Sequence, residues 1–158
     1  MKNNNKLGFT LVELLIVIAI FALIANVTMI SLGKARRESR DAQRMSDVSQ
    51  LRSALHLFSL EYGEYPDGED IPLGTGNHII LNTDGWSTNT TPPIFMYSVP
   101  RDPRMLSQGI SACLDTSDDI CDYGYSLDGN DFVIYFYLEG SVGNMTEGLH
   151  AATKDTVL

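Results

Sequence analysis

The sequence predicts an α+β fold in which one long N-terminal helix packs on a small C-terminal antiparallel β-sheet with long loops. Three observations favour this fold. Residues 9–32 are almost entirely apolar, residues 33–62 are rich in helix formers, and residues 63–158 hold all six prolines and two strand-like runs. The length of 158 residues suits one domain together with a membrane segment.

The first half of the predicted helix has the length of a membrane span. Residues 9–32 contain a single charge, Glu13, and 24 helical residues extend about 36 Å, enough for a bilayer core. The apolar region of a secretory signal peptide is shorter, about 7–15 residues, and ends at a small-residue cleavage site that this stretch lacks. We therefore expect a retained span, preceded by the short basic segment "MKNNNKLG" at residues 1–8.

The second half of the helix carries an apolar stripe. Its members recur at steps of three and four residues: Met45, Val48, Leu51, Leu55, Phe58 and Tyr62. Gly63 suits the position after a helix end, and Pro66 prevents continuation. Residues 9–62 are thus predicted to form one helix about 80 Å long. The stripe in its second half must be buried against the C-terminal part of the chain.

The C-terminal residues 63–158 are predicted to form a β-rich head with long loops. The expected strands lie around His78–Leu81, Phe95–Val99, Tyr123–Leu127 and Phe132–Glu139. Gly129-Asn130 supplies a tight hairpin turn between the last two. One face of Phe132–Leu138 is expected to cover the helix stripe, and the other to face a loop or a neighbouring subunit.

Charge is distributed unevenly along the chain. Residues 1–62 carry eight Lys/Arg and five Asp/Glu, whereas residues 63–158 carry three Lys/Arg and fifteen Asp/Glu, within a total of −9. The acidic head would repel nucleic acid.

The two cysteines, Cys113 and Cys121, lie in a polar stretch with seven residues between them. Two cysteines are too few for a zinc site or a disulfide scaffold. We expect a single disulfide that closes a short loop, which requires an oxidising compartment. The alternative is two unpaired thiols.

The segment "GFTLVELLIVIAI", Gly8 to Ile20, resembles the N-terminal signature of bacterial type IV pilins and type II secretion pseudopilins. The resemblance implies that a prepilin peptidase cuts after Gly8 and methylates the new N-terminus of Phe9. The fifth mature residue in this family is a Glu, here Glu13. "YGEYPDG", Tyr62 to Gly68, resembles the end of the long helix in major pseudopilins, and "VPRDP", Val99 to Pro103, matches later parts of the group more weakly.

The resemblance implies the type IV pilin fold, with an αβ-loop after the helix, and a structural role as a filament subunit. Its partners would be further copies of the chain, the prepilin peptidase, a platform membrane protein and an assembly ATPase. The precursor would sit in the cytoplasmic membrane with its head outside, and the mature form would lie in an extracellular or periplasmic filament. Charge counting alone would place the C-terminal flank inside, because only Lys2 and Lys6 precede the span and five cations follow it. The expected orientation of the head therefore depends on the resemblance and not on charge.

Two departures from the family pattern stand out. Many members carry a proline where this chain has Ile30, so melting of the helix there would depend on Asn26, Val27, Thr28 and Gly33. The calcium-binding loop of some pseudopilins is not evident.

Glu13 has two readings. In an assembly role, its carboxylate faces the cationic amine of Phe9 on a neighbouring subunit and sets the axial register. In a local role, it pairs with Phe9 of its own chain and benefits from the helix N-terminus. We favour assembly.

The cations after the span are expected on a solvated helix face or against lipid head groups, rather than on DNA: Lys34, Arg36, Arg37, Arg40 and Arg44. The acidic residues of the head are expected in solvated loops. Calcium is the less favoured reading for Asp115, Asp118, Asp119 and Asp122, with Asp128 and Asp131 nearby, because their spacing fits no EF-hand loop.

No motif indicates catalysis. His56, His78 and His150 lack partners at metal-ligand spacing, so we expect neither an enzyme nor a cofactor. A type IV pilus-like filament subunit ranks first and a type II secretion pseudopilin second. A monomeric membrane-anchored binding domain is the reading from another class, and it leaves the Gly8-Phe9 junction and Glu13 unexplained.

Overall fold

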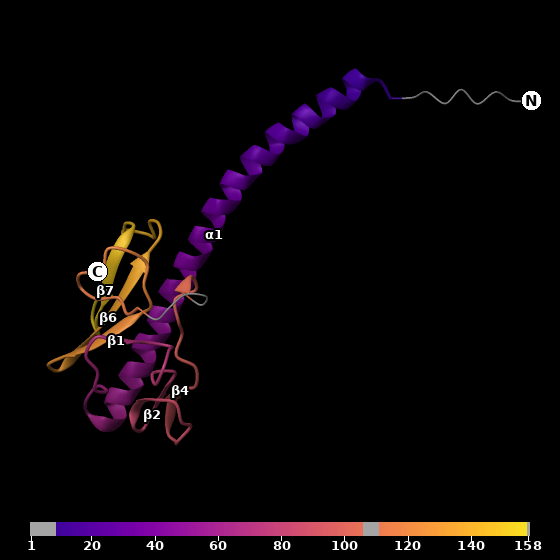
Figure 1. Cartoon of the computed structure of the whole chain (residues 1–158). Coiled ribbons are helices and arrows are strands. Elements are labelled where there is room, and N and C mark those ends of the chain that lie inside the picture. Colours follow the sequence, from indigo (N-terminus) through magenta and orange to yellow (C-terminus); the bar gives the residue numbers. More distant parts are fainter. Residues whose placement is uncertain (1–8, 106–110, 158) are drawn as a thin grey trace, which may run out of the picture. The chain divides into compact units, whose positions relative to one another are not determined.

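The computed structural model describes residues 9–105 and 111–157, without the side chains of residues 27, 28 and 30. The chain divides into two units with the boundary between Arg36 and Arg37. Among the residues just given, helix α1 (Leu11–Tyr62) is the one α-helix, and it runs through both units (Figure 1). It begins two residues later than the expected Phe9, since Thr10 occupies the N-cap.

The helix ends where the sequence predicts. Gly63 has φ 80°, and its N–H donates to the carbonyl of Ser59 over 2.8 Å. This left-handed residue satisfies a carbonyl of the last turn, as a glycine after a helix end commonly does. Pro66 follows three residues later and cannot rejoin the helix.

Within the described residues, seven strands form two small antiparallel sheets. The four-stranded sheet has the order β1-β5-β6-β7, and its members are β1 (Ile71–Pro72), β5 (Gly124–Asp128), β6 (Asp131–Leu138) and β7 (Gly148–Ala152). The three-stranded sheet has the order β3-β2-β4, and its members are β2 (Ile80–Asn82), β3 (Gly85–Ser87) and β4 (Ile94–Met96). Figure 1 shows the two sheets on either side of the C-terminal half of α1.

The hairpin between β5 and β6 confirms the predicted turn. Asp128 pairs with Asp131, so that Gly129-Asn130 is the two-residue loop, with Gly129 at φ 60°. The strands expected at His78–Leu81 and Phe95–Val99 are shifted to β2 and β4. Strands β1, β3 and β7 were not expected, because their few residues acquire strand geometry only by pairing with β5, β2 and β6.

The core lies between the helix stripe and the inner face of β6. Val48, Leu51, Leu55 and Phe58 are buried as the stripe predicts. On the sheet, every second residue of β6 is buried: Phe132, Ile134, Phe136 and Leu138. This alternation places one face of the strand on the core, at about 25 cal/mol for each Å² of apolar surface removed from water.

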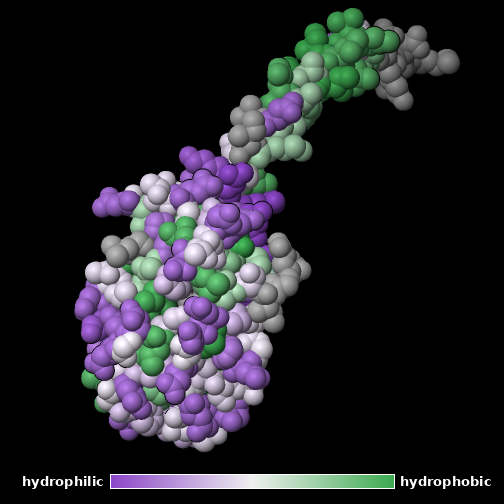
Figure 2. Space-filling view, turned by 60° about the vertical axis from the view of Figure 1, so that its left-hand side comes forward, coloured by the Kyte–Doolittle hydropathy of each residue, from purple (hydrophilic) through white to green (hydrophobic). Residues whose placement is uncertain are grey.

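The N-terminal part of α1 has the opposite surface character. Its apolar side chains are exposed, with Phe9 at 81% and Leu14 at 59%, and Figure 2 shows them as a hydrophobic surface. The helix is long and apolar enough to cross a membrane. It is also continuous through residues 26–33, where proline is absent and where Gly33 does not interrupt it.

Candidate functional site

The start of α1 is a reciprocal capping arrangement between Thr10 and Glu13. The Glu13 N–H donates to Thr10 Oγ1 over 3.2 Å. In return, Glu13 Oε2 accepts from the Thr10 backbone N–H at 2.9 Å and from the Thr10 hydroxyl at 2.8 Å. This is a capping box, in which Thr and Glu three residues apart satisfy two otherwise unpaired N–H groups at a helix N-terminus.

Thr10 therefore caps the helix, a role that was not expected, although the T-x-x-E spacing of "TLVE" is a readable signal. Within its own chain, the Glu13 carboxylate is thus partnered by Thr10. The local alternative given above expected Phe9, the preceding residue, as this partner. The candidate cleavage residue Gly8 and the leader residues 1–8 lie outside the described residues.

A second site joins the helix to the head through buried charges. Arg44 is fully buried and donates to three carboxylates from three parts of the fold: Asp41 at 2.5 Å, Asp102 at 2.6 Å and Glu139 at 2.9 Å. Glu139 directly follows β6, and its backbone N–H donates to Asp41 over 3.0 Å. Arg40 adds a two-bond contact to Glu139, at 2.6 and 2.5 Å.

The position of Arg44 corrects the expectation that all the cations after the span are solvated. Arg44 lies one turn before Val48, on the same face as the apolar stripe, so that it is carried into the head with the stripe. A buried guanidinium requires several hydrogen-bond acceptors. The acidic residues of the head supply them, in Asp102 from "VPRDP" and Glu139 from "YLEG".

The cluster changes the acid–base properties of its members. Burial by itself would raise the pKa of Glu139, but the hydrogen bonds from Arg40 and Arg44 outweigh it and lower the pKa to about 2. Burial would lower the pKa of Arg44, and its bonds to Asp102, Glu139 and Asp41 raise it instead. Nearby, burial raises the pKa of Asp47, against the hydrogen bond that Tyr123 donates to it over 3.0 Å.

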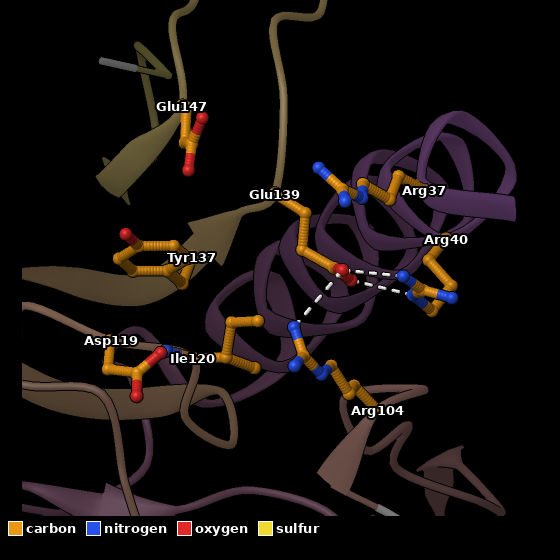
Figure 3. A pocket seen from close by; sticks show the side chains of 8 residues that line it. All are labelled: Arg37, Arg40, Arg104, Asp119, Ile120, Tyr137, Glu139 and Glu147. Carbon is orange, nitrogen blue, oxygen red and sulfur yellow. Dashed lines mark hydrogen bonds and ion pairs between the residues drawn. The ribbon is translucent and has the colours of Figure 1, made fainter. Parts of the chain in front are cut away.

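An open pocket of about 470 Å³ lies over this cluster. Figure 3 shows Arg37, Arg40 and Arg104 on one side of the pocket and Asp119, Tyr137 and Glu147 on the other. Glu139 lies between the two sides and accepts from Arg40 and, over 3.3 Å, from Arg104.

The candidate disulfide residues come together in the head. Cys113 and Cys121 are bonded, with their Cα atoms 5.0 Å apart. The Cys113 N–H donates to the Asp122 carbonyl, and the Asp122 N–H donates to the Ser111 carbonyl, each over 2.7 Å. Gly124 allows this loop to pack on β5, because a Cβ at that position would lie 1.8 Å from the Cys113 carbonyl oxygen.

The acidic residues suggested for calcium are dispersed. Asp122 is buried and forms a two-bond ion pair with Arg101, at 2.7 and 3.0 Å. Asp115, Asp118 and Asp119 are exposed in the loop that the disulfide closes. Across the described residues, no three His, Cys, Asp or Glu side chains are grouped so as to hold a metal ion.

The fold and the N-terminal segment together define a class of protein. One long helix, apolar and exposed in its first part and packed on antiparallel sheets in its second, is consistent with the α+β fold of type IV pilins. Residues 3–25 match the family described as "Prokaryotic N-terminal methylation motif". The chain thus carries a prepilin-type N-terminal segment, and the motif with the apolar helix indicates a membrane-anchored precursor.

Among curated proteins, the chain is similar to three named "Type II secretion system core protein G". The one from Klebsiella michiganensis is 33% identical over 70 residues, 44% of this chain and 49% of that protein. Those from Aeromonas hydrophila and Pectobacterium carotovorum subsp. carotovorum are 29% identical over 69 residues and 36% over 63, covering 44% and 39% of this chain and 48% and 40% of the relatives. The chain thus matches at most about half the length of these relatives, and no solved structure matches it significantly.

Proposed function

We propose that this chain is a structural subunit of a filament of the type II secretion pseudopilus kind. The observation that carries the proposal is the prepilin motif at residues 3–25 leading directly into an exposed apolar helix. The relatives named as core proteins of type II secretion systems favour the secretion filament over the surface pilus, which was the first expectation from the sequence.

In this proposal, the precursor waits in the membrane until a prepilin peptidase cuts after Gly8 and methylates Phe9. Assembly then replaces the lipid around residues 9–32 with the same segment of neighbouring copies. A platform membrane protein and an assembly ATPase would drive extrusion. The acidic head would form the surface of the filament.

Glu13 has two separable tasks under this proposal. In the uncleaved chain its carboxylate caps its own helix through Thr10. After cleavage, the new amine of Phe9 on a neighbouring subunit is a stronger partner, because both charges are then removed from water and leaving either one unpaired is costly.

The capping box makes these tasks testable with three variants. Glu13→Gln keeps a capping side chain, since Gln also serves at this position, and removes only the charge. Thr10→Ala breaks the cap and keeps the charge, and Glu13→Leu removes both. In cells that supply the assembly machinery, we expect filaments to be lost in Glu13→Gln and Glu13→Leu and largely kept in Thr10→Ala. Wild-type filament levels in Glu13→Gln would refute the charge-pairing role.

Mass spectrometry of the mature chain tests the proposal as a whole. A chain that begins at a methylated Phe9 is the expected result. An intact Met1, in cells whose prepilin peptidase processes a control substrate, would contradict the filament proposal and favour a monomeric membrane-anchored domain.

A surface pilus remains the second candidate, favoured by the disulfide-closed loop of the head. The two filaments differ in location. Filaments released by mechanical shearing of intact cells would identify a surface pilus, whereas filaments retained within the envelope at natural expression levels would identify the secretion type.

A further inference from the structure

The pocket above the charged cluster has two walls of opposite charge. Three guanidinium groups, those of Arg37, Arg40 and Arg104, form one wall. The carboxylates of Asp119 and Glu147 form the other, together with the ring of Tyr137. Figure 3 shows the two groups facing each other across the opening.

Much of this charge is not used within the fold. Glu139, between the walls, is already neutralised by Arg40 and Arg44. Among the described residues, the side chains of Arg37 and Glu147 make no hydrogen bond or ion pair, and Arg104 uses only one guanidinium nitrogen, in its 3.3 Å contact with Glu139. Arg37, Arg104, Asp119 and Glu147 are all exposed. The pocket therefore offers donors on one side and acceptors on the other to a bound group.

The arrangement selects a ligand that is itself dipolar. A plain anion would meet the carboxylates of Asp119 and Glu147, and a plain cation would meet three arginines. A phosphate on the arginine wall suits guanidinium groups, which donate several hydrogen bonds to phosphate oxygens. A primary ammonium on the opposite wall suits carboxylates, and a pocket of this size is adequate for a small head group.

The position of Arg37 in the chain indicates where such a ligand comes from. Arg37 follows Leu32, the last residue of the apolar span, by five residues, which is about 7.5 Å along a helix. The polar interface of a bilayer extends about 5–7 Å beyond each side of the hydrocarbon core. In the membrane-anchored precursor, Arg37 therefore lies at the outer edge of the lipid head-group layer, which its long side chain can reach.

We propose that this pocket binds the phosphoethanolamine head group of a phospholipid while the uncleaved precursor is anchored in the membrane. The phosphate lies against Arg37, Arg40 and Arg104, and the ammonium donates to Glu147 and Asp119. This inference goes beyond the filament proposal, because it concerns the precursor before cleavage and assembly. Its test needs neither step.

The primary test measures lipid selectivity with the full-length precursor in detergent micelles, by native mass spectrometry. Phosphatidylethanolamine, phosphatidylglycerol and phosphatidylcholine with identical acyl chains are titrated separately. We expect phosphatidylethanolamine to bind about tenfold more tightly than phosphatidylglycerol, which has no ammonium, and than phosphatidylcholine, whose quaternary group cannot donate hydrogen bonds. Equal binding of all three, or a preference for phosphatidylglycerol, would overturn the proposal.

Two variants assign the selectivity to the two walls. Glu147→Gln should abolish the preference for phosphatidylethanolamine over phosphatidylglycerol, and Arg37→Gln should weaken the binding of both by about fivefold. The matched controls are Arg36→Gln, the neighbouring exposed cation, and Glu61→Gln, an exposed acid of the helix outside the pocket. The controls should leave the lipid ratio unchanged. The same loss of selectivity in the controls as in the pocket variants would overturn the assignment.

A further experiment with a soluble ligand separates recognition of the head group from contact with the acyl chains. Glycerophosphoethanolamine, added to the lipid-free precursor, should bind saturably and lose its binding in Glu147→Gln. If lipids bind selectively but the soluble head group does not bind at all, the selectivity arises outside this pocket and the proposal fails. If the variants impair only filament formation and not lipid binding, the occupant is a neighbouring subunit instead, which also overturns the proposal.

Discussion

The guanidinium of Arg44 on helix α1 donates to Oε1 of Glu139, the residue after strand β6, over 2.9 Å, and both side chains are buried. The two residues are 95 positions apart in the chain. Their contact joins the helix to the end of the central hairpin, at the end of the core farther from Gly63. The head is thus held to the helix by apolar packing around Leu51 and Leu55 and by this charged cluster.

Removal of Arg44 should destabilise the head strongly. Arg44→Ala leaves Asp41, Asp102 and Glu139 facing one another without their common cation, and breaking a buried ion cluster in this way costs about 3–5 kcal/mol. Denaturant unfolding of the full-length chain in detergent, followed by the fluorescence of Trp86, measures the change. Arg36→Ala, which removes an exposed cation of the same helix, serves as the control. A loss below about 1 kcal/mol for Arg44→Ala would contradict the structural role of the cluster.

Acid should weaken the head between about pH 4.5 and pH 2. The pKa of Glu139 falls from 4.5 to about 2 on folding, so its contribution is fully present above pH 4.5 and is lost as the pH falls through the folded value. The contribution is at most about 3 kcal/mol. Burial raises the pKa of Asp47, so protonation of Asp47 offsets part of the loss. The measurement is the free energy of unfolding from pH 6 to pH 2.

The control for this pH dependence is Glu139→Gln, which cannot titrate at that position. It should be less stable than the wild-type chain at pH 6 and should show a flatter decline on acidification. An identical slope in the two proteins would show that another carboxylate is responsible.

Loss of the disulfide should cost about 2.5 kcal/mol, the chain-entropy value for a loop of this length. The paired substitution Cys113→Ser with Cys121→Ser tests it by the same denaturant unfolding. Treatment of the wild-type chain with reductant should give a similar loss and should leave the double variant unchanged. A reductant effect on the double variant would show that the reagent acts elsewhere.

Gly124→Ala should displace the disulfide loop from β5. The new Cβ would lie 1.8 Å from the Cys113 carbonyl oxygen, which is backbone and cannot turn away. We expect a loss of about 3 kcal/mol, at the upper end for overpacking. Gly140→Ala is the matched control, because its Cβ would meet only Asp41 Oδ2 at an ordinary 3.5 Å. Equal stability of the two variants would contradict the close packing of the loop.

Much of the architecture was predictable from local pattern. The continuous long helix, the stripe from Val48 to Phe58, the helix end at Gly63 and the Gly129-Asn130 hairpin are all confirmed. Each depends on periodicity or on turn chemistry, which act over a few residues. Strands β1, β3 and β7 were missed, because such short segments become strands only when a longer neighbour fixes their register.

The candidate sites also divide into those with a local sequence pattern and those that depend on residues far apart in the chain. The Thr10–Glu13 capping box could have been read from its spacing, and the juxtaposition of Cys113 and Cys121 was expected from their polar surroundings. Arg44 was expected among the solvated cations, because the local sequence does not show that Asp102 and Glu139 lie close enough to accept its hydrogen bonds. The pocket with Arg37 and Glu147 on opposite walls joins residues 110 positions apart and has no local signature.

The sequence by itself therefore determined the elements whose physics is local: an apolar segment long enough to span a bilayer, an amphipathic continuation and a tight hairpin. Only the tertiary structure decided which charges are buried. Burial of Arg44 depends on Asp102 and Glu139 arriving from distant loops to complete its hydrogen bonds. An ion of this kind is stable away from water only when all its partners are in place, and that is a property of the assembled fold.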